Sequence, residues 1–168
     1  NRSLFIIAEN ENYYTLISTK VIDSTCFAHG GTAGYTNAYT DIRLFTEGSF
    51  FNWAFTEDEK NLLTSVTFKN GVSSGSASES ADLTNKVSIP SKAEVEQYFS
   101  TQNDKKKTTT DYAKLNGVQA NEYGQAYWWT RSRSSSNPYR LTPGGSFDAN
   151  ATGYFSSAGI LPQIFLAK

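Results

Sequence analysis

Hydrophobic residues follow a strand-like pattern at both ends of the chain and a helix-like pattern in its middle. Near the N-terminus, two β-prone runs flank a polar turn and predict a hairpin. Short apolar runs separated by Gly, Pro and Ser predict further strands near the C-terminus. The expected strands are residues 3–8, 13–18, 66–68, 140–142, 146–148 and 163–166. We expect the N- and C-terminal strands to pair in one antiparallel sheet that contains both Phe5 and Ile164.

Two helix-start signals lie in the middle of the chain. Thr56 stands three residues before Glu59, and Ser91 stands three residues before Glu94, which is the spacing of a capping box. The expected helices are residues 41–53, residues 56–63, and a third that follows Ser91 with Val95, Tyr98 and Phe99 on one face. The sequence therefore predicts an α+β fold with two or three short helices.

A length of 168 residues suits one domain with its own core, and no internal repeat is visible. No apolar run approaches the roughly 18 residues of a membrane span, so none is expected. The first residue is Asn and no signal peptide is seen, so we expect residues 1–168 to be a single domain excised from a larger exported protein. The net charge is -1, and the one basic cluster, residues 105–107, is expected to be a solvated loop. We therefore expect no nucleic-acid partner.

Composition fits a binding surface and an ordinary secreted β domain about equally well. Aromatic residues make up 14% of the chain and charged residues 18%, compared with a usual charged share of about 25%. Tyr supplies wide contact area and Ser and Asn supply adaptable hydrogen bonds, although an ordinary secreted β domain has the same composition. Cys26 is the only cysteine, so an internal disulfide is excluded. This is unusual for a eukaryotic secreted domain but not for a bacterial or viral exported protein.

Four segments together resemble one protein family. Residues 127–132, Tyr-Trp-Trp-Thr-Arg-Ser, are similar to its Trp-Trp-Leu-Arg-Ser motif, and residues 159–162, Gly-Ile-Leu-Pro, are similar to its closing Gly-Val-Arg-Pro. Residues 40–60 resemble its short helix pair, and residues 85–99 resemble its unit of a strand followed by a Ser-capped helix. The family is a bacterial domain of unassigned function that is frequent in exported proteins of gut bacteria.

The resemblance implies a fold and a mode of binding. The family is similar in layout to C-type-lectin-like folds of the formylglycine-generating-enzyme type. Variable proteins of diversity-generating retroelements, among them phage receptor binders, use that fold and display their ligand contacts in the C-terminal region. The chain departs from the family at Leu161, where arginine is usual, so we expect one buried ion pair to be missing. It also has Phe45-Thr46 in place of Trp-Leu.

The candidate catalytic groups have simpler structural explanations. Cys26 and His29 have no second ligand cluster with which to hold a metal, and a Gly-rich loop does not promise a Cys-His pair. One cysteine also cannot supply the cysteine pair of the formylglycine-generating enzymes. The consecutive acids at 57–59 suit a first helical turn, whereas a glycosidase needs two carboxylates facing across a cleft. The lectin calcium motifs are absent, which leaves calcium elsewhere open. We expect no enzyme activity, no catalytic residue, no metal site and no cofactor.

The aromatic stretch near the C-terminus offers the strongest binding signal. Trp128 and Trp129 would face opposite sides of a strand, so either both lie in the core or one is a partly exposed platform for a sugar ring or side chain. Arg131 is expected to brace the C-terminal loops rather than to contact a ligand.

Residues 133–139 and 148–157 combine Tyr and Phe with small polar residues, which is typical of interaction loops and of ordinary solvated loops. A turn at 143–145 would bring both segments to one side of a hairpin. The ligand-binding residues expected on one exposed surface are Arg133, Ser135, Asn137, Tyr139, Asp148, Asn150, Tyr154 and Phe155. We expect a module that binds a protein or glycan ligand on another surface and is secreted or displayed on a cell or virion. The alternative is a structural or self-assembling surface subunit.

Overall fold

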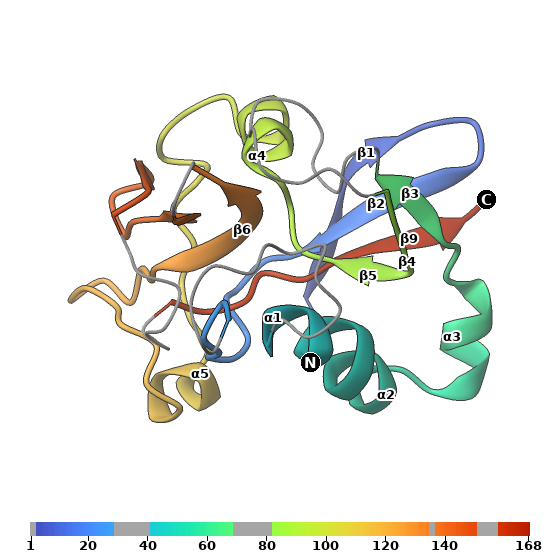
Figure 1. Ribbon diagram of the computed structural model, residues 1–168, viewed down its shortest axis with the longest axis horizontal. Coiled ribbons are helices and arrows are strands. Elements are labelled where there is room, and N and C mark those ends of the chain that lie inside the picture. Colours follow the sequence, from blue (N-terminus) through green and yellow to red (C-terminus); the bar gives the residue numbers. More distant parts are fainter. Residues whose placement is uncertain (1–2, 29–40, 69–81, 135–136, 151–157) are drawn as a thin grey trace.

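The computed structural model describes residues 3–28, 41–68, 82–134, 137–150 and 158–168, which form a mixed α+β fold with antiparallel sheets and short helices (Figure 1). The strands are β1 (Leu4–Glu9), β2 (Tyr13–Ser18), β3 (Val66–Phe68), β4 (Leu83–Asn85), β5 (Val87–Ser88), β6 (Trp128–Arg133), β7 (Pro138–Leu141), β8 (Phe147–Asp148) and β9 (Gln163–Ala167). The helical segments are α1 (Asp41–Leu44), η1 (Phe45–Phe50), α2 (Phe51–Ala54), α3 (Glu57–Leu62), α4 (Lys92–Tyr98) and α5 (Asp111–Leu115).

The two ends of the chain meet in a four-stranded sheet of order β1-β2-β9-β5. β1 and β2 form the predicted hairpin, and β2 then pairs with β9 so that Leu16 lies opposite Ile164. Phe5 and Ile164 therefore belong to one sheet, and the predicted pairing of the terminal strands is confirmed. β6, β7 and β8 form a separate three-stranded sheet, and β3 pairs with β4.

Alternation along the strands gives the four-stranded sheet two apolar faces. Ile164 packs in a cluster with Phe55, at the end of α2, whereas Ile17 packs with Val95 of α4. Figure 1 accordingly shows α1 and α2 below this sheet and α4 above it. The sheet is therefore covered by helices on both sides, and the side chains between these layers form the core.

The predicted helices are present, and their start signals work as expected. Residues 41–54 are helical throughout, with a wide π-helical turn, η1, between α1 and α2. Thr56 and Glu59 form a reciprocal capping box before α3, and Ser91 and Glu94 form another before α4. The expectation of at most three helices is wrong, because α5 follows Thr110 as a fourth helical segment. Five residues are too few to show a helical period in the sequence.

The glycine of the closing motif stands where two segments approach closely. Gly159 accepts from the Trp129 amide at 3.0 Å and donates to Tyr127 at 2.9 Å. A Cβ at Gly159 would clash with the side chain of Val21 and the carbonyl of Asp23. Two positions on, Leu161 is fully buried in an apolar cluster, so an apolar contact stands where the family resemblance led us to expect an arginine.

No helix among the residues that the structure describes is long and apolar enough to cross a membrane.

Candidate functional site

β6 is a rigid support for the C-terminal region. Trp128 and Trp129 are both fully buried, and their indole N–H groups donate to the carbonyls of Lys105 at 3.2 Å and Thr25 at 3.0 Å. Because the two rings face opposite sides of a strand that is buried on both faces, they join two different core clusters. The core alternative is therefore confirmed, and neither indole is an exposed ligand platform.

Arg131 is held in a buried ion pair rather than at the C-terminal loops. Its guanidinium donates to both carboxylate oxygens of Glu94, at 2.7 and 2.6 Å, and to the carbonyl of Ile89 at 2.6 Å. It also lies 4.0 Å from the ring centroid of Phe68. Since Glu94 also accepts from the Ser91 amide, Arg131 fixes the start of α4 against β6. The expected structural role of Arg131 is correct, but it braces α4.

The β7–β8 hairpin carries the described part of the predicted binding surface. Its three-residue loop closes with Gly145 at a φ of 84°, as in the type I turn followed by a left-handed residue that commonly joins strands. The register then places Arg140 opposite Asp148 and Leu141 opposite Phe147. The predicted hairpin is thus confirmed, and its outer ends lie side by side.

The hairpin separates the predicted residues between its two faces. Tyr139 lies on the face of Phe147, with ring centroids 6.3 Å apart in an edge contact. Asp148 lies on the other face, where it accepts from Arg140 at 2.9 Å, and Arg140 in turn lies over the Tyr127 ring. Asp148 lies opposite Arg140, and neighbouring residues along a strand point to opposite faces, so Tyr139 and Asp148 lie on different faces. The expectation that they share one surface is therefore wrong.

The remaining predicted site residues have different environments. Arg133 is only 7% exposed, so it does not lie on an exposed surface as we expected. Asn137 is half-buried at the start of the hairpin, and Asn150 is exposed at its end. Ser135, Tyr154 and Phe155 lie outside the described residues. Asn150 stays with Asp148, since its backbone amide donates to the Asp148 carboxylate at 2.8 Å, so the predicted residues that remain together are Asn137 and Tyr139.

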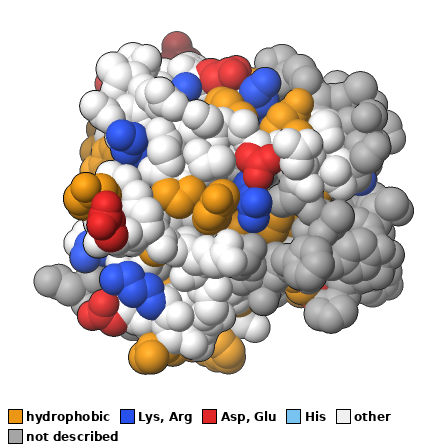
Figure 2. Space-filling view, turned by 90° about the vertical axis from the view of Figure 1, so that its left-hand side faces the viewer, with side chains coloured by type: hydrophobic (Ala, Val, Ile, Leu, Met, Phe, Trp, Pro, Cys, Tyr) orange, Lys and Arg blue, Asp and Glu red, His pale blue; other side chains and the backbone are white. Residues whose placement is uncertain are grey.

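Two lysines that were not among the predicted binding residues lie beside Tyr139 and Phe147. The Lys92 ammonium is 5.0 Å from the Tyr139 ring centroid and 5.3 Å from that of Phe147, and Lys105 is 5.4 Å from the latter. Half-buried rings flanked by ammonium groups form a cation–aromatic surface. We call Lys92, Lys105, Tyr139 and Phe147 the hairpin cluster. Figure 2 views the molecule from the side that carries β6, and there hydrophobic side chains alternate with basic and acidic ones.

The basic run at 105–107 is more than the solvated loop that we expected. Lys107 is half-buried, with its ammonium 4.0 Å from the ring centroid of Phe99. Burial lowers the pKa of this ammonium, and the nearby charge of Asp104 opposes that shift. The ammonium groups of Lys105 and Lys107 therefore lie over aromatic rings.

Cys26 is poorly suited to act as a nucleophile. Burial, followed by the charge and hydrogen bond of Asp41, raises the pKa of its thiol to about 11. Because the thiolate is the reactive form, a thiol with this pKa stays protonated near neutral pH. His29 lies outside the described residues, and within the described ranges no three His, Cys, Asp or Glu side chains are grouped to hold a metal.

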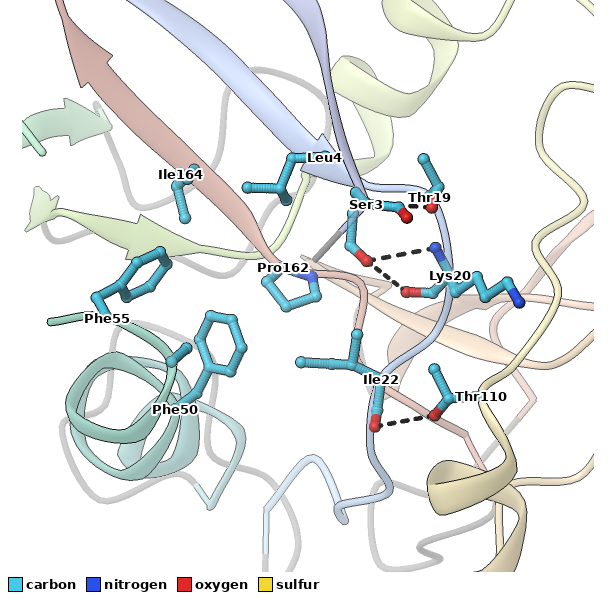
Figure 3. Close-up of a pocket in the computed structure, with 12 residues that line it drawn as sticks. Ser3, Leu4, Thr19, Lys20, Ile22, Phe50, Phe55, Thr110, Pro162 and Ile164 are labelled. Carbon is cyan, nitrogen blue, oxygen red and sulfur yellow. Dashed lines mark hydrogen bonds between the residues drawn. The ribbon is translucent and has the colours of Figure 1, made fainter. Parts of the chain in front are cut away.

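A cavity of about 430 Å³ lies between one end of the four-stranded sheet and α2 (Figure 3). Phe50 and Phe55 flank α2 and form one wall, and Leu4, Ile164 and Pro162 form the facing wall. The described residues that line it are Ser3, Leu4, Ser18, Thr19, Lys20, Ile22, Phe50, Ala54, Phe55, Thr110, Pro162 and Ile164. Sequence reasoning missed this site, since its walls come from five separate segments of the chain.

Comparison with known protein families identifies the family of this chain. A family model described as a domain of unknown function (DUF6273) matches residues 12–167. The chain therefore belongs to this family. No curated protein and no solved structure matched it.

Proposed function

We propose that this domain is a non-enzymatic binding module that recognises a protein or glycan ligand through the outer end of the β7–β8 hairpin. The observation that carries the proposal is the hairpin cluster, in which half-buried Tyr139 and Phe147 meet two lysine ammonium groups. Tyrosine and cationic side chains on a rigid support are enriched at interaction hot spots. The same proposal includes a C-type-lectin-like layout, with which the pairing of β2 with β9 is consistent. It also includes secretion or display on a cell or a virion.

The support beneath the hairpin favours recognition by a preformed surface. β7 pairs with β6, whose six residues are all buried, and the Arg140–Asp148 ion pair closes the opposite face of the hairpin. A ligand that contacts Tyr139 therefore meets a surface with little conformational freedom left to lose, which raises affinity for a given contact area. The revised contact set is Asn137 and Tyr139 with Lys92 and Lys105.

The reactive and acidic groups that the sequence offered as catalytic candidates lie outside the hairpin cluster and have structural roles, which favours binding over catalysis. Cys26 is buried and protonated near neutral pH, as its raised pKa requires. Glu59 and Glu94 are engaged in the capping boxes of α3 and α4. General acid–base catalysis needs a titratable group within hydrogen-bond reach of the substrate. Carboxylates that are held in capping boxes are less suited to this role.

A glycan array tests the proposal directly. The labelled full chain should bind a subset of glycans, with sialylated or sulfated members above neutral ones because of the two lysines. Tyr139→Ala should weaken that binding by about 1–3 kcal/mol. Tyr112→Ala is the matched control, since Tyr112 is a 61% exposed tyrosine on α5 and lies outside the hairpin cluster. If neither this array nor a protein-ligand screen shows binding that depends on Tyr139, the hairpin proposal is wrong.

One observation favours the alternative of a self-assembling subunit. Within the described ranges β1 pairs only with β2, and it exposes 37% of Phe5 and 57% of Ile6. An exposed apolar edge strand can pair with another chain, although the register shift between Ile6 and Ala8 disturbs this edge. Light scattering of the wild type and of Ile6→Lys would show whether association depends on β1.

A further inference from the structure

We propose that the cavity beside α2 binds a small amphiphile with an apolar body and a single anionic head group. The ligand class comprises medium-chain carboxylates and aromatic acids of similar size. The volume of about 430 Å³ lies within the range of about 300–1,000 Å³ that is usual for small-ligand sites. The cavity shares no residue with the hairpin cluster, so this proposal does not rest on the proposed function.

The walls of the cavity select an apolar body. The rings of Phe50 and Phe55 meet edge to face with centroids 5.7 Å apart, and both point toward the space that Pro162 and Ile164 close from the other side (Figure 3). Ala54, the smallest side chain of the lining, leaves room between these rings and the sheet. Such walls favour hydrocarbon surface because its transfer from water is favourable.

Three of the four side-chain hydroxyl groups in the described lining are already engaged with the backbone. Ser18 Oγ donates to the Lys20 carbonyl at 2.6 Å, Thr19 Oγ1 to the Ser3 carbonyl at 3.1 Å, and Thr110 Oγ1 to the Ile22 carbonyl at 3.3 Å. A sugar ring in this cavity would lose water from its hydroxyls and find few partners, which is unfavourable. The cavity is therefore suited to a different ligand from the glycan considered for the hairpin.

Charge at the mouth selects the head group. Among the described residues of the lining, Lys20 is the one that carries a charge, and it is exposed. None of the ion pairs found among the described residues involves Lys20. Figure 3 shows its side chain running outward from the mouth, away from Phe50 and Phe55. Since a lysine stem is flexible, the ammonium can meet an anionic head group at the mouth while the apolar body lies between the rings.

Isothermal titration calorimetry of the full chain with decanoate and with 1-naphthoate tests this proposal. The alcohols decanol and 1-naphthalenemethanol carry the same apolar bodies without charge. We expect saturable binding of at least one acid, and the comparison of the two acids shows whether an aliphatic or an aromatic body is preferred. Absence of saturable binding of both acids would overturn the proposal.

Two pairs of variants locate the binding. Ala54→Leu fills the cavity and should weaken binding of the acid about tenfold or more, whereas Ala120→Leu, at an exposed residue outside the lining, should not. Lys20→Gln should weaken binding of the acid about two- to fivefold and leave binding of the alcohol unchanged, with Lys114→Gln as the control.

Thermal melting of each variant verifies folding. Unchanged binding in folded Ala54→Leu would place the ligand elsewhere and overturn the proposal, and equal affinity for acid and alcohol would overturn the anionic head group. Tyr139→Ala should leave all these titrations unchanged, which separates this test from that of the hairpin.

Discussion

The interior around β6 and the cavity beside α2 are both built from aromatic and branched apolar side chains, yet only the first is filled. Trp128 and Trp129 sit within a strand, with both rings fully buried. Phe50 and Phe55 stand at the two ends of α2, where they meet strand ends near Leu4 and Pro162. Side chains within paired strands interdigitate at high density, whereas element ends diverge and leave volume. Stability should therefore reside mainly around β6, and room for a ligand lies at the ends of elements.

The largest effect is expected from opening the filled region. Trp129→Ala should reduce the free energy of unfolding by about 3–5 kcal/mol, because it removes a fully buried indole and its hydrogen bond to Thr25. Chemical denaturation measures this loss. Trp53→Ala is the control, since Trp53 is 79% exposed and its removal should change stability by less than about 0.5 kcal/mol. Equal losses in the two variants would contradict the contrast between the regions.

Breaking the ion pair behind β6 should have the next largest effect. Glu94→Gln leaves the fully buried Arg131 guanidinium without its counter-charge and should cost about 3 kcal/mol in the same unfolding experiment. Combining it with Arg131→Met removes both charges and should restore part of the loss. A double variant as unstable as the sum of the two single variants would show that the charges are not coupled.

Truncation at the cavity should cost less. Phe50→Ala removes a half-buried ring that already borders empty volume, so a loss of about 1–2 kcal/mol is expected. Denaturation of this variant beside Trp129→Ala compares the two regions directly. A loss as large as that of Trp129→Ala would mean that the cavity wall is as tightly packed as the interior around β6.

Thiol labelling should affect the fold least. It compares how readily a reagent in solution reaches a buried side chain and a side chain on the cavity wall. Cys26 should react slowly with a disulfide reagent at pH 8, because burial and Asp41 raise its pKa to about 11. A second thiol introduced by Ala54→Cys, on the cavity wall, should react quickly. Since the Cys26 pKa is higher in the folded chain than its usual value, this group makes stability fall as pH rises toward about 11. Fast labelling of Cys26 in the native chain would contradict its burial and its raised pKa.

Local signals in the sequence predicted much of the fold. The capping boxes at Thr56 and Ser91 were predictable because each depends on two residues three apart. The β7–β8 hairpin was predictable from its Pro-Gly-Gly turn. The same register also implies that Arg140 faces Asp148 while Tyr139 lies on the other face, and period-two alternation along the strands would have revealed this.

The parts that were missed depend on contacts between distant segments. Arg133 lies in a polar stretch that reads as a loop, but β6 continues through it into the interior and buries it. The cavity has no local signature, because Phe50 and Pro162 are more than a hundred positions apart in the chain and meet only in the folded molecule. Lys92 joins the hairpin cluster from α4 for the same reason.

The place of β9 has a consequence for the order of folding. β9 is the last strand of the chain, yet it lies between β2 and β5 and joins them into one sheet. During synthesis the β1–β2 hairpin can form early from neighbouring residues, but β5 has no place in the four-stranded sheet until residues near 164 have left the ribosome. The long segment between β2 and β9 must close into a loop before the two strands can pair, and this closure costs entropy. Assembly of this sheet should therefore be a late and slow step. Until then, the apolar side chains of β2 and β5 are exposed, and we expect the chain to be most prone to aggregation at this stage.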